Sequence, residues 1–304
     1  MNAIETQDLS KSYRIGHRSV PVVDKLNLTV SKGIVFGYLG PNGAGKTTTI
    51  RMLCGVTRPS SGSATVAGIP LSKPDQVKAA IGYANQAASV YHDLSLEENL
   101  RFKASLYLPK SEIKGAVEEV LERFSLAEHR KVLAGQLSGG WRQRLLLGTA
   151  MVHRPSLIFL DEPTANVDPV GRRDLWDLIY SLSLDGVTVF VSTHYMEEAE
   201  RCHQLAMIAS GKILAQGKPE DLRKGTPGYF YRLEPDNLSD GLKAAKGIAE
   251  IRDAWISGNS VRISSERPLH ELNLEGKKLE AVFPSLEDSF VHLASGGQLK
   301  EASL

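Results

Sequence analysis

The sequence lacks the features that mark secreted, membrane-embedded and nucleic-acid-binding proteins. Its 304 residues include two cysteines, Cys54 and Cys202, too few for a disulfide framework and suited to a reducing compartment. The 36 basic and 35 acidic residues give a net charge of +1, which offers no general attraction to nucleic acid or acidic lipid. No apolar run approaches the roughly 18 residues that a membrane helix needs, and the first residues lack a signal-peptide pattern. These absences predict a soluble, cytoplasmic chain.

Internal repeats and low-complexity tracts are also absent, and the length suits roughly two domains. Three short apolar runs are present instead, at Ile34–Leu39, Leu157–Leu160 and Val187–Ser192. Runs that are apolar on both faces are typical of strands in a sheet buried on both sides. Because each run precedes a plausible helix, the sequence predicts an α/β layer.

A helical block separates the first two runs. Ser95 and Glu98 form a capping box whose helix is expected to continue to just before Pro109, and Ser111 is expected to begin a second helix. We therefore expect a helical insert at about 87–137.

The C-terminal part has a different pattern. Turn-forming residues cluster at Gly225–Gly228, which predicts a boundary between domains at 1–228 and 229–304. Short strands and a last helix are expected beyond it, and a net charge of −3, from nine basic and twelve acidic residues, argues against a DNA-binding tail.

Residues Gly40–Thr47 fit the phosphate-loop pattern G-x-x-x-x-G-K-[ST], with an apolar strand before it and a helix-compatible segment after it. Glycines let the main chain wrap a triphosphate, so that N–H groups and the helix N-terminus face the anion. Lys46 would supply a positive charge to the β- and γ-phosphates, and the Thr47 hydroxyl would ligate Mg²⁺. Nucleotide binding is favoured over a simple glycine-rich turn.

Polar residues follow two of the predicted strands. Asp161 and Glu162 come directly after one, and His194 follows another. Ligands gather at the carboxyl ends of strands in an open α/β sheet, so these residues are expected near the phosphate loop. Asp161 would hold Mg²⁺, and Glu162 would orient or deprotonate an attacking water. On their own, His194 and Gln86 are equally compatible with structural roles.

The segment Leu137–Gln143 reads LSGGWRQ and is similar to the LSGGQ signature of the nucleotide-binding subunits of ABC transporters. The other motifs of that family occur in the same order over residues 1 to about 220. They are the aromatic Tyr13, the Walker A loop Gly40–Thr48, Gln86 of the Q-loop, the signature, the Walker B strand Leu157–Glu162, the D-loop Ala165–Asp168 and the switch residue His194.

The resemblance implies an α/β P-loop NTPase fold, with a RecA-like core, an antiparallel β lobe and a helical subdomain, followed by a small C-terminal α+β domain. It implies ATP and Mg²⁺ as ligands, with adenine stacked on Tyr13 and the metal held by Thr47, Gln86 and Asp161. The residues expected to bind nucleotide are Tyr13, Gly40, Pro41, Asn42, Gly43, Ala44, Gly45, Lys46, Thr47, Thr48, Gln86, Ser138, Gly139, Gly140 and Asp168.

The same resemblance implies that Glu162 is the catalytic base, that His194 contacts the γ-phosphate and that Lys46 completes the catalytic set. Ser138 and Gly140 would face the nucleotide held by a second, identical chain in a head-to-tail dimer. Glycine N–H groups at a helix start can form such an anion site, although a helix cap at Ser138 fits the same geometry.

Two features favour the ABC-2 exporter branch of the family. Trp141 replaces the signature glutamine, and the segment 284–290 is similar to the closing P-S-L-E-D-x-F of ABC-2 and daunorubicin-resistance-type ATPases. The D-loop reads Ala-Asn-Val-Asp where Ser-Ala-Leu-Asp is usual, but it keeps Asp168.

The leading hypothesis is therefore the ATPase subunit of an ABC-2-type exporter at the cytoplasmic face of the membrane. It would power a separate membrane permease that moves a drug-like, lipid-like or other hydrophobic substrate, with no nucleic acid as partner. The alternatives are a soluble ABC ATPase acting on DNA or ribosomes, and the ATPase subunit of an importer. A single cassette of near-zero charge without heptads counts against the first alternative.

Overall fold

The computed structural model describes residues 1–85, 90–165, 167–269, 273–274 and 276–296. Two compact units divide the chain, Met1–Gln216 and Gly217–Leu304. The division lies earlier than the expected boundary at Gly228, because α8 (Pro219–Gly225) packs against α10 (Leu286–Ala294) within the C-terminal unit. Within the described ranges, no helix combines the length and the apolar character needed to cross a membrane.

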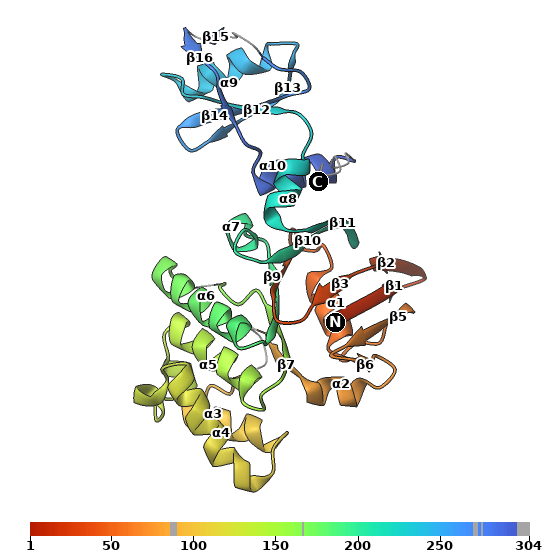
Figure 1. The fold of residues 1–304 in the computed structure, drawn as a ribbon, viewed down its shortest axis with the longest axis vertical. Coiled ribbons are helices and arrows are strands. Elements are labelled where there is room, and N and C mark those ends of the chain that lie inside the picture. The colour runs from red at the N-terminus through yellow and green to blue at the C-terminus, as the bar shows by residue number, and fades with distance from the viewer. Residues whose placement is uncertain (86–89, 166, 270–272, 275, 297–304) are drawn as a thin grey trace. The chain divides into compact units, whose positions relative to one another are not determined.

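A sheet of six strands forms the centre of the N-terminal unit, in the order β11-β10-β4-β9-β8-β7 (Figure 1). Strands β10, β4, β9, β8 and β7 run parallel to their neighbours. The strands are β4 (Val35–Leu39), β7 (Ile81–Ala84), β8 (Leu157–Asp161), β9 (Thr188–Thr193), β10 (Gln204–Ala209) and β11 (Lys212–Gly217).

Both faces of this sheet are buried, as the apolar runs predict. Along β8, Leu157 and Phe159 belong to a core that includes Ile50 of α1 (Lys46–Leu53), whereas Ile158 and Leu160 belong to a second core. Helices α5 (Gly139–Met151) and α6 (Pro169–Leu184) supply residues to that second core. The carboxyl ends of the parallel strands are therefore held by apolar packing on both sides.

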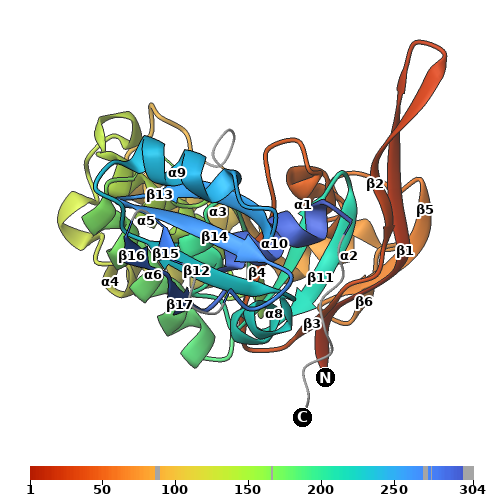
Figure 2. The ribbon, with the colours of Figure 1, turned by 90° about the horizontal axis from the view of Figure 1, so that it is seen from above.

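Antiparallel strands form a separate lobe of the N-terminal unit. Strand β1 pairs with β2, β3 and β5, and β5 pairs with β6. Figure 2 shows the hairpin of β1 and β2 extending beyond the rest of the lobe. The elements are β1 (Asn2–Ile15), β2 (Arg18–Leu26), β3 (Thr29–Ser31), β5 (Ser61–Val66), β6 (Ile69–Pro70) and the helix α2 (Pro74–Ala80).

The helical insert contains α3 (Leu96–Ser105) and α4 (Lys110–Arg123), followed by the 3-10 turns η1 (Ala127–His129) and η2 (Ala134–Gln136). The capping box at Ser95 is confirmed: the Ser95 hydroxyl accepts from the Glu98 N–H, and the Glu98 carboxylate accepts from the Ser95 N–H at 2.8 Å. Helix α3 ends at Ser105, earlier than expected. The second helix begins one residue before Ser111, since Pro109 is its N-cap.

The C-terminal unit is a small α+β fold, as expected. Its main sheet has the order β13-β14-β12-β17, with antiparallel pairing throughout, and its apolar core includes Leu233, Val261 and Ile263. Helix α9 is an addition to the elements expected from the sequence. The elements are β12 (Tyr229–Leu233), α9 (Leu238–Lys246), β13 (Ile251–Ser257), β14 (Ser260–Ser265), β15 (Asn273–Leu274), β16 (Lys277–Lys278) and β17 (Glu280–Val282).

Candidate nucleotide site

The phosphate loop connects β4 to α1 and needs glycine at particular positions. Gly43 and Gly45 have φ angles of 80° and 100°, which side chains other than glycine rarely adopt. A Cβ atom at Gly40 would lie 2.3 Å from the Ile208 carbonyl oxygen, and one at Gly45 would lie 2.7 Å from that of Val22. The loop therefore keeps its main chain close to two neighbouring strands while α1 begins directly after it.

Lys46 is the first residue of α1, and 5% of its side chain is exposed. Its ammonium donates to the carbonyl oxygens of Gly40 at 2.8 Å and Pro41 at 3.1 Å, and it pairs with Glu162 Oε1 at 3.2 Å. A pocket of about 210 Å³ opens here; its lining residues are Val22, Asn42, Gly43, Gly45, Lys46, Thr47, Thr48 and Glu162. The structure thus brings the loop, its lysine and Glu162, the residue that follows β8, together.

Strands β8 and β9 bring the two acids and His194 to the same edge. The Ser192 hydroxyl donates to Asp161 Oδ1 at 2.5 Å and accepts from the Glu162 N–H at 3.1 Å. His194 Nδ1 lies 3.4 Å from Glu162 Oε1, a contact without hydrogen-bond geometry that becomes an ion pair when the imidazole is protonated. Glu162 has φ 50°, a strained value for a residue with a side chain and one often found at functional sites.

The oxygen donors that Mg²⁺ prefers are present beside the loop. Thr47 is exposed and lines the pocket, and the half-buried Asp161 carboxylate ends β8 with one oxygen held by Ser192. Hydroxyl and carboxylate oxygens are typical ligands of this cation, which also keeps several waters and binds substrate phosphates. The donor set therefore fits Mg²⁺. Gln86, the third expected ligand, lies outside the described residues.

Other expected site residues do not line this pocket. Ser138 and Gly139 are exposed at the start of α5, where the Ser138 side chain makes no capping hydrogen bond and Gly140 follows in the first turn. Asp168 caps α6 instead: its carboxylate accepts from the N–H groups of Val170 and Gly171, both at 3.0 Å. The Gly171 hydrogen bond, the largest of the causes, lowers the pKa of Asp168.

Tyr13 lies on the β1–β2 hairpin, exposed, with the Lys11 ammonium 5.1 Å from its ring centroid. Ser192 carries no recognised motif, although its hydroxyl contacts both acids in the structure. The available signal was a small polar residue near the end of an otherwise apolar strand. Val22 lines the pocket from the antiparallel lobe. No sequence pattern marks it as a site residue.

Comparison with known proteins assigns this arrangement to a family. Residues 23–165 match the family model described as ABC transporter. The daunorubicin/doxorubicin resistance ATP-binding protein DrrA of Streptomyces peucetius is 35% identical over 307 residues, which cover 96% of this chain and 92% of that protein. The chain belongs to the ATP-binding proteins of the ABC transporter family. This confirms the resemblance and the P-loop α/β fold.

Other relatives in the ABC family extend the comparison. The Nod factor export ATP-binding protein I of Cupriavidus metallidurans is 41% identical over 240 residues, covering 76% of this chain and 78% of that protein. The probable multidrug ABC transporter ATP-binding protein YbhF of Escherichia coli (strain K12) is 35% identical over 294 residues, covering 93% of this chain. The chain spans about half the length of YbhF, 51%.

Solved structures show the same fold. A chain titled as the ATP binding subunit of an ABC transporter has a TM-score of 0.64 at 28% identity, covering 73% of this chain and 92% of that one. The ATP-binding cassette MJ0796, described as dimeric and bound to ADP and Pi in a post-hydrolysis state, has a TM-score of 0.65. Its identity is 23%, and the match covers 71% of this chain and 98% of that chain.

Proposed function

We propose that this chain binds and hydrolyses ATP and powers a separate membrane permease in an ABC-2-type export system. The observation that carries this proposal is the meeting of Lys46, Glu162 and His194 at the phosphate loop, with separations of 3.2 and 3.4 Å from Glu162. A cation that binds the phosphates and a residue that orients or deprotonates the attacking water are recurring parts of phosphoryl-transfer sites, and His194 lies beside the second of these.

Each group has a separate task in hydrolysis. Lys46 exchanges its carbonyl partners for the β- and γ-phosphate oxygens, and Glu162 accepts the proton of the water that attacks the γ-phosphorus. His194 contacts the γ-phosphate and helps to hold the carboxylate beside it. Mg²⁺, held by Thr47 and Asp161, would neutralise charge on the β- and γ-phosphate oxygens. Tyr13 stacks on the adenine, so the β1–β2 hairpin and the phosphate loop must contact the same nucleotide.

We assign the start of α5 to contact with the nucleotide that a partner chain binds. Ser138, Gly139 and Gly140 present a hydroxyl and main-chain N–H groups to solvent, away from the residues that line this chain's own pocket. Two identical chains arranged head to tail would place this helix start against the γ-phosphate of the opposite ATP. Asp168, at the start of α6, would face the same interface.

Export is favoured over import and over action on DNA or ribosomes by the names of three relatives. They are a probable multidrug ABC transporter protein, a daunorubicin/doxorubicin resistance protein and a Nod factor export protein. For this chain we propose export of a drug-like, lipid-like or other hydrophobic molecule. The chain would act at the cytoplasmic face of the membrane, and the cargo would contact the permease.

A groove between α1 and the helical insert is the surface assigned to the permease. It has a volume of about 360 Å³, and its lining includes four exposed apolar side chains, Val56, Tyr91, Phe102 and Leu106, beside polar residues such as Lys78 and Lys103. The rings of Tyr91 and Phe102 meet edge to face at 5.1 Å. Exposed apolar side chains gathered in one groove suit a helix of a partner protein, and Asn85 connects this groove to the end of β7.

Two measurements test the proposal. Purified chain should release phosphate from Mg-ATP, and Phe102→Asp should keep that activity while losing co-purification with the membrane permease that the wild-type chain retains. Leu184→Asp, at an exposed apolar position on α6, is the matched control and should keep both. Absence of ATP hydrolysis in the wild-type chain, alone and with its membrane protein, would contradict the enzymatic part. Retained co-purification of Phe102→Asp would contradict the docking part.

A further inference from the structure

Glu198 joins the two segments that carry the catalytic groups. It lies in the short helix α7 (Met196–Ala199), and only 2% of the residue is exposed. One carboxylate oxygen accepts from the Thr193 hydroxyl at 2.7 Å, and the other accepts from the hydroxyl of Thr164. Thr193 directly precedes His194, and Thr164 follows Glu162 by two residues. One buried carboxylate therefore links the segment of the base to the segment of the switch histidine.

A second link joins the same two segments. Ser192 hydrogen-bonds to Asp161 and to the main chain of Glu162, at 2.5 and 3.1 Å. Both links therefore join the segment that carries Glu162 to the segment that carries His194. Because Glu162 has a strained φ of 50°, the surrounding contacts must hold its backbone in place.

Arg172 extends the network to α6. Its Nε lies 3.9 Å from Glu198 Oε1, its guanidinium lies over the Tyr195 ring at 5.0 Å, and its main-chain N–H donates to the main-chain carbonyl oxygen of Asp168 at 2.9 Å. A buried carboxylate is costly unless charges and hydrogen bonds compensate it. Two hydroxyls and one guanidinium do so here, and they come from three different segments.

We infer that Glu198 is a positioning residue for ATP hydrolysis, which fixes Glu162 relative to His194 and connects both to the helix that begins at Asp168. This inference rests on the proposed ATPase activity. Glu198 is not among the residues that line the phosphate-loop pocket. Its loss should therefore slow turnover and leave nucleotide affinity intact.

The test compares variants in the full chain. Glu198→Gln and Thr164→Val should lower kcat about tenfold, as expected for hydrogen bonds to a charged group, with ATP affinity within about twofold of wild type. Thr164→Ser, which keeps the hydroxyl, should restore kcat. Glu197→Gln is the matched control, since Glu197 is exposed on the same helix. The double variant of Glu198→Gln and Thr164→Val should lose no more than Glu198→Gln alone, because Thr164 acts through Glu198.

Three results for Glu198→Gln would overturn the inference. They are an unchanged kcat, a loss of ATP affinity without a loss of kcat, and a lower melting temperature with normal turnover. Amide hydrogen exchange tests the link without relying on activity. Residues 161–165 and 192–198 should exchange faster in Glu198→Gln than in Glu197→Gln, and equal rates would refute the link. Absence of ATP hydrolysis in the wild-type chain would overturn the proposed function instead, and the exchange result would still decide the link.

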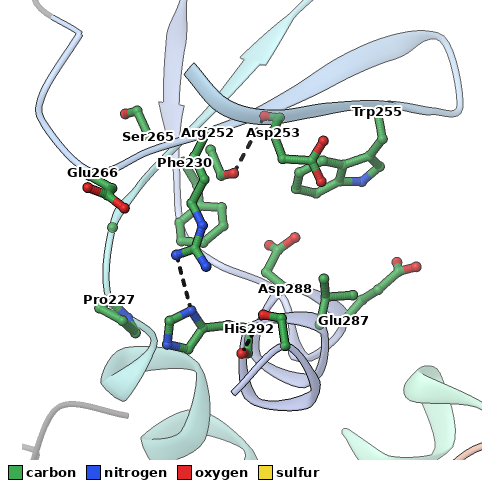
Figure 3. Close-up of a pocket in the computed structure, with 14 residues that line it drawn as sticks. Pro227, Phe230, Arg252, Asp253, Trp255, Ser265, Glu266, Glu287, Asp288 and His292 are labelled. Carbon is green, nitrogen blue, oxygen red and sulfur yellow. Dashed lines mark hydrogen bonds between the residues drawn. The ribbon is translucent and has the colours of Figure 1, made fainter. Parts of the chain in front are cut away.

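An independent feature lies in the C-terminal unit. A pocket of about 720 Å³, within the usual size range of small-molecule sites, lies between α10 and the strands β12 to β14 (Figure 3). Its apolar lining includes the buried Phe230, the half-buried Trp255 and the exposed Val291. Aromatic and aliphatic surface is therefore available inside a solvent-accessible hollow.

The charges around this pocket are mostly negative. Among the described residues, no ion pair reaches the exposed carboxylates of Asp253, Glu266 or Glu287. Asp288, with 1% of its side chain exposed, points from α10 toward the same space (Figure 3); its Oδ2 pairs with Arg262 at 2.6 Å, while its Oδ1 has no hydrogen-bond partner.

One cation also lines the pocket. Arg252 Nη1 lies 3.4 Å from His292 Nδ1, and Figure 3 shows the two side chains meeting on the side away from Trp255. The carboxylates of Asp253, Glu287 and Asp288 lie on the side of the pocket that holds Trp255.

The geometry points to a binding site for an organic cation with an apolar or aromatic body. Trp255 offers a ring face for cation–π contact, and the neighbouring carboxylates supply the opposite charge. Tetraphenylphosphonium and tetraphenylborate test this directly, because they have nearly the same shape and opposite charge. Calorimetric titration of the full chain should show saturable binding of the phosphonium and none of the borate.

Variants locate the binding. Asp253→Asn combined with Glu287→Gln, and separately Trp255→Leu, should weaken phosphonium binding about tenfold, the effect expected for a desolvated cation–π or charge contact. Glu250→Gln, an exposed acid outside the pocket, should change nothing. Equal binding of both probes, no saturable binding, or binding that these variants leave unchanged would overturn the assignment. None of these results depends on ATP hydrolysis.

Discussion

Two helices of the N-terminal unit begin with glycine-containing segments, and their surroundings differ. At α1, the left-handed Gly45 leads into a lysine with 5% exposure, and Glu162 and His194 lie nearby. At α5, Ser138 is exposed in an extended conformation and caps nothing. Both helix starts present N–H groups suited to an anion. At the first, a lysine, a carboxylate and an imidazole lie together, whereas at the second the Arg142 guanidinium donates to the Leu137 carbonyl oxygen at 3.0 Å. The difference suggests two halves of a composite site, one half contributed by each chain.

Removing the charge at α1 should have the largest effect. Lys46→Ala deprives the loop of its only lysine, so ATP affinity should fall roughly 10- to 100-fold, the range for hydrogen bonds between charged groups. Turnover should be lost as well. Titration with a fluorescent ATP analogue measures the affinity, and Lys32→Ala, at an exposed lysine, is the control. Near-normal binding by Lys46→Ala would contradict the assignment of α1.

A bulky substitution at the start of α5 should abolish turnover without changing ATP affinity. Ser138→Arg should leave ATP affinity of the single chain unchanged and abolish hydrolysis, because the damage falls on the partner's site. Ser111→Arg places the same side chain near the start of α4, where it should affect neither property. If Ser138→Arg alone lost ATP affinity, the helix start would belong to the chain's own site.

Substitution of the base, Glu162, which follows β8, should affect turnover alone. Glu162→Gln keeps the size of the side chain and should lower turnover roughly 10²- to 10⁴-fold, the usual contribution of a positioned general base. ATP affinity should persist, since Lys46 remains. Phosphate release under single-turnover conditions measures the effect. Turnover that survives in this variant would show that Glu162 is not the base.

The two helix starts also differ in how well the sequence predicts them. Short-range rules were enough for the phosphate loop, the capping box at Ser95 and the strand that ends at Asp161, because each depends on neighbouring residues. The hydroxyl of Ser192 and the carboxylate of Glu198 act across separations of about thirty residues, as in the Thr164–Glu198 contact, so no local pattern marks them. Whether Ser138 faces a partner depends on a second chain, which a single sequence does not describe.

Contacts between residues far apart in the sequence also explain the boundary of the C-terminal unit. Turn residues at Gly225–Gly228 predicted a boundary there, but the division follows Gln216 because the Thr226 and Ser289 hydroxyls hydrogen-bond at 2.6 Å. This contact spans 63 residues. Helix α9 was missed for a different reason, since its glycine and serine residues have weak helix propensity and the Asn237 cap carries its start.

The smallest effect is expected at Trp141, where this chain departs from the family signature. Its ring stacks on His129 at 4.1 Å, and Arg144 lies over it at 5.2 Å. Trp141→Gln should lower the free energy of unfolding by about 1 kcal/mol, the value of an aromatic pair. Turnover should change little, because Ser138, Gly139 and Gly140 remain. Thermal unfolding measured beside phosphate release tests this, and a large loss of turnover would give the ring a role at the partner's nucleotide.

The composite site is tested most directly by the oligomeric state of Glu162→Gln with Mg-ATP, measured by gel filtration with light scattering. Slowed hydrolysis should trap ATP between two chains, so the protein should elute as a dimer with ATP and as a monomer without it. Adding Ser138→Arg to the same chain should abolish the dimer while ATP still binds. A monomer at saturating ATP, or a dimer that Ser138→Arg leaves intact, would contradict the account.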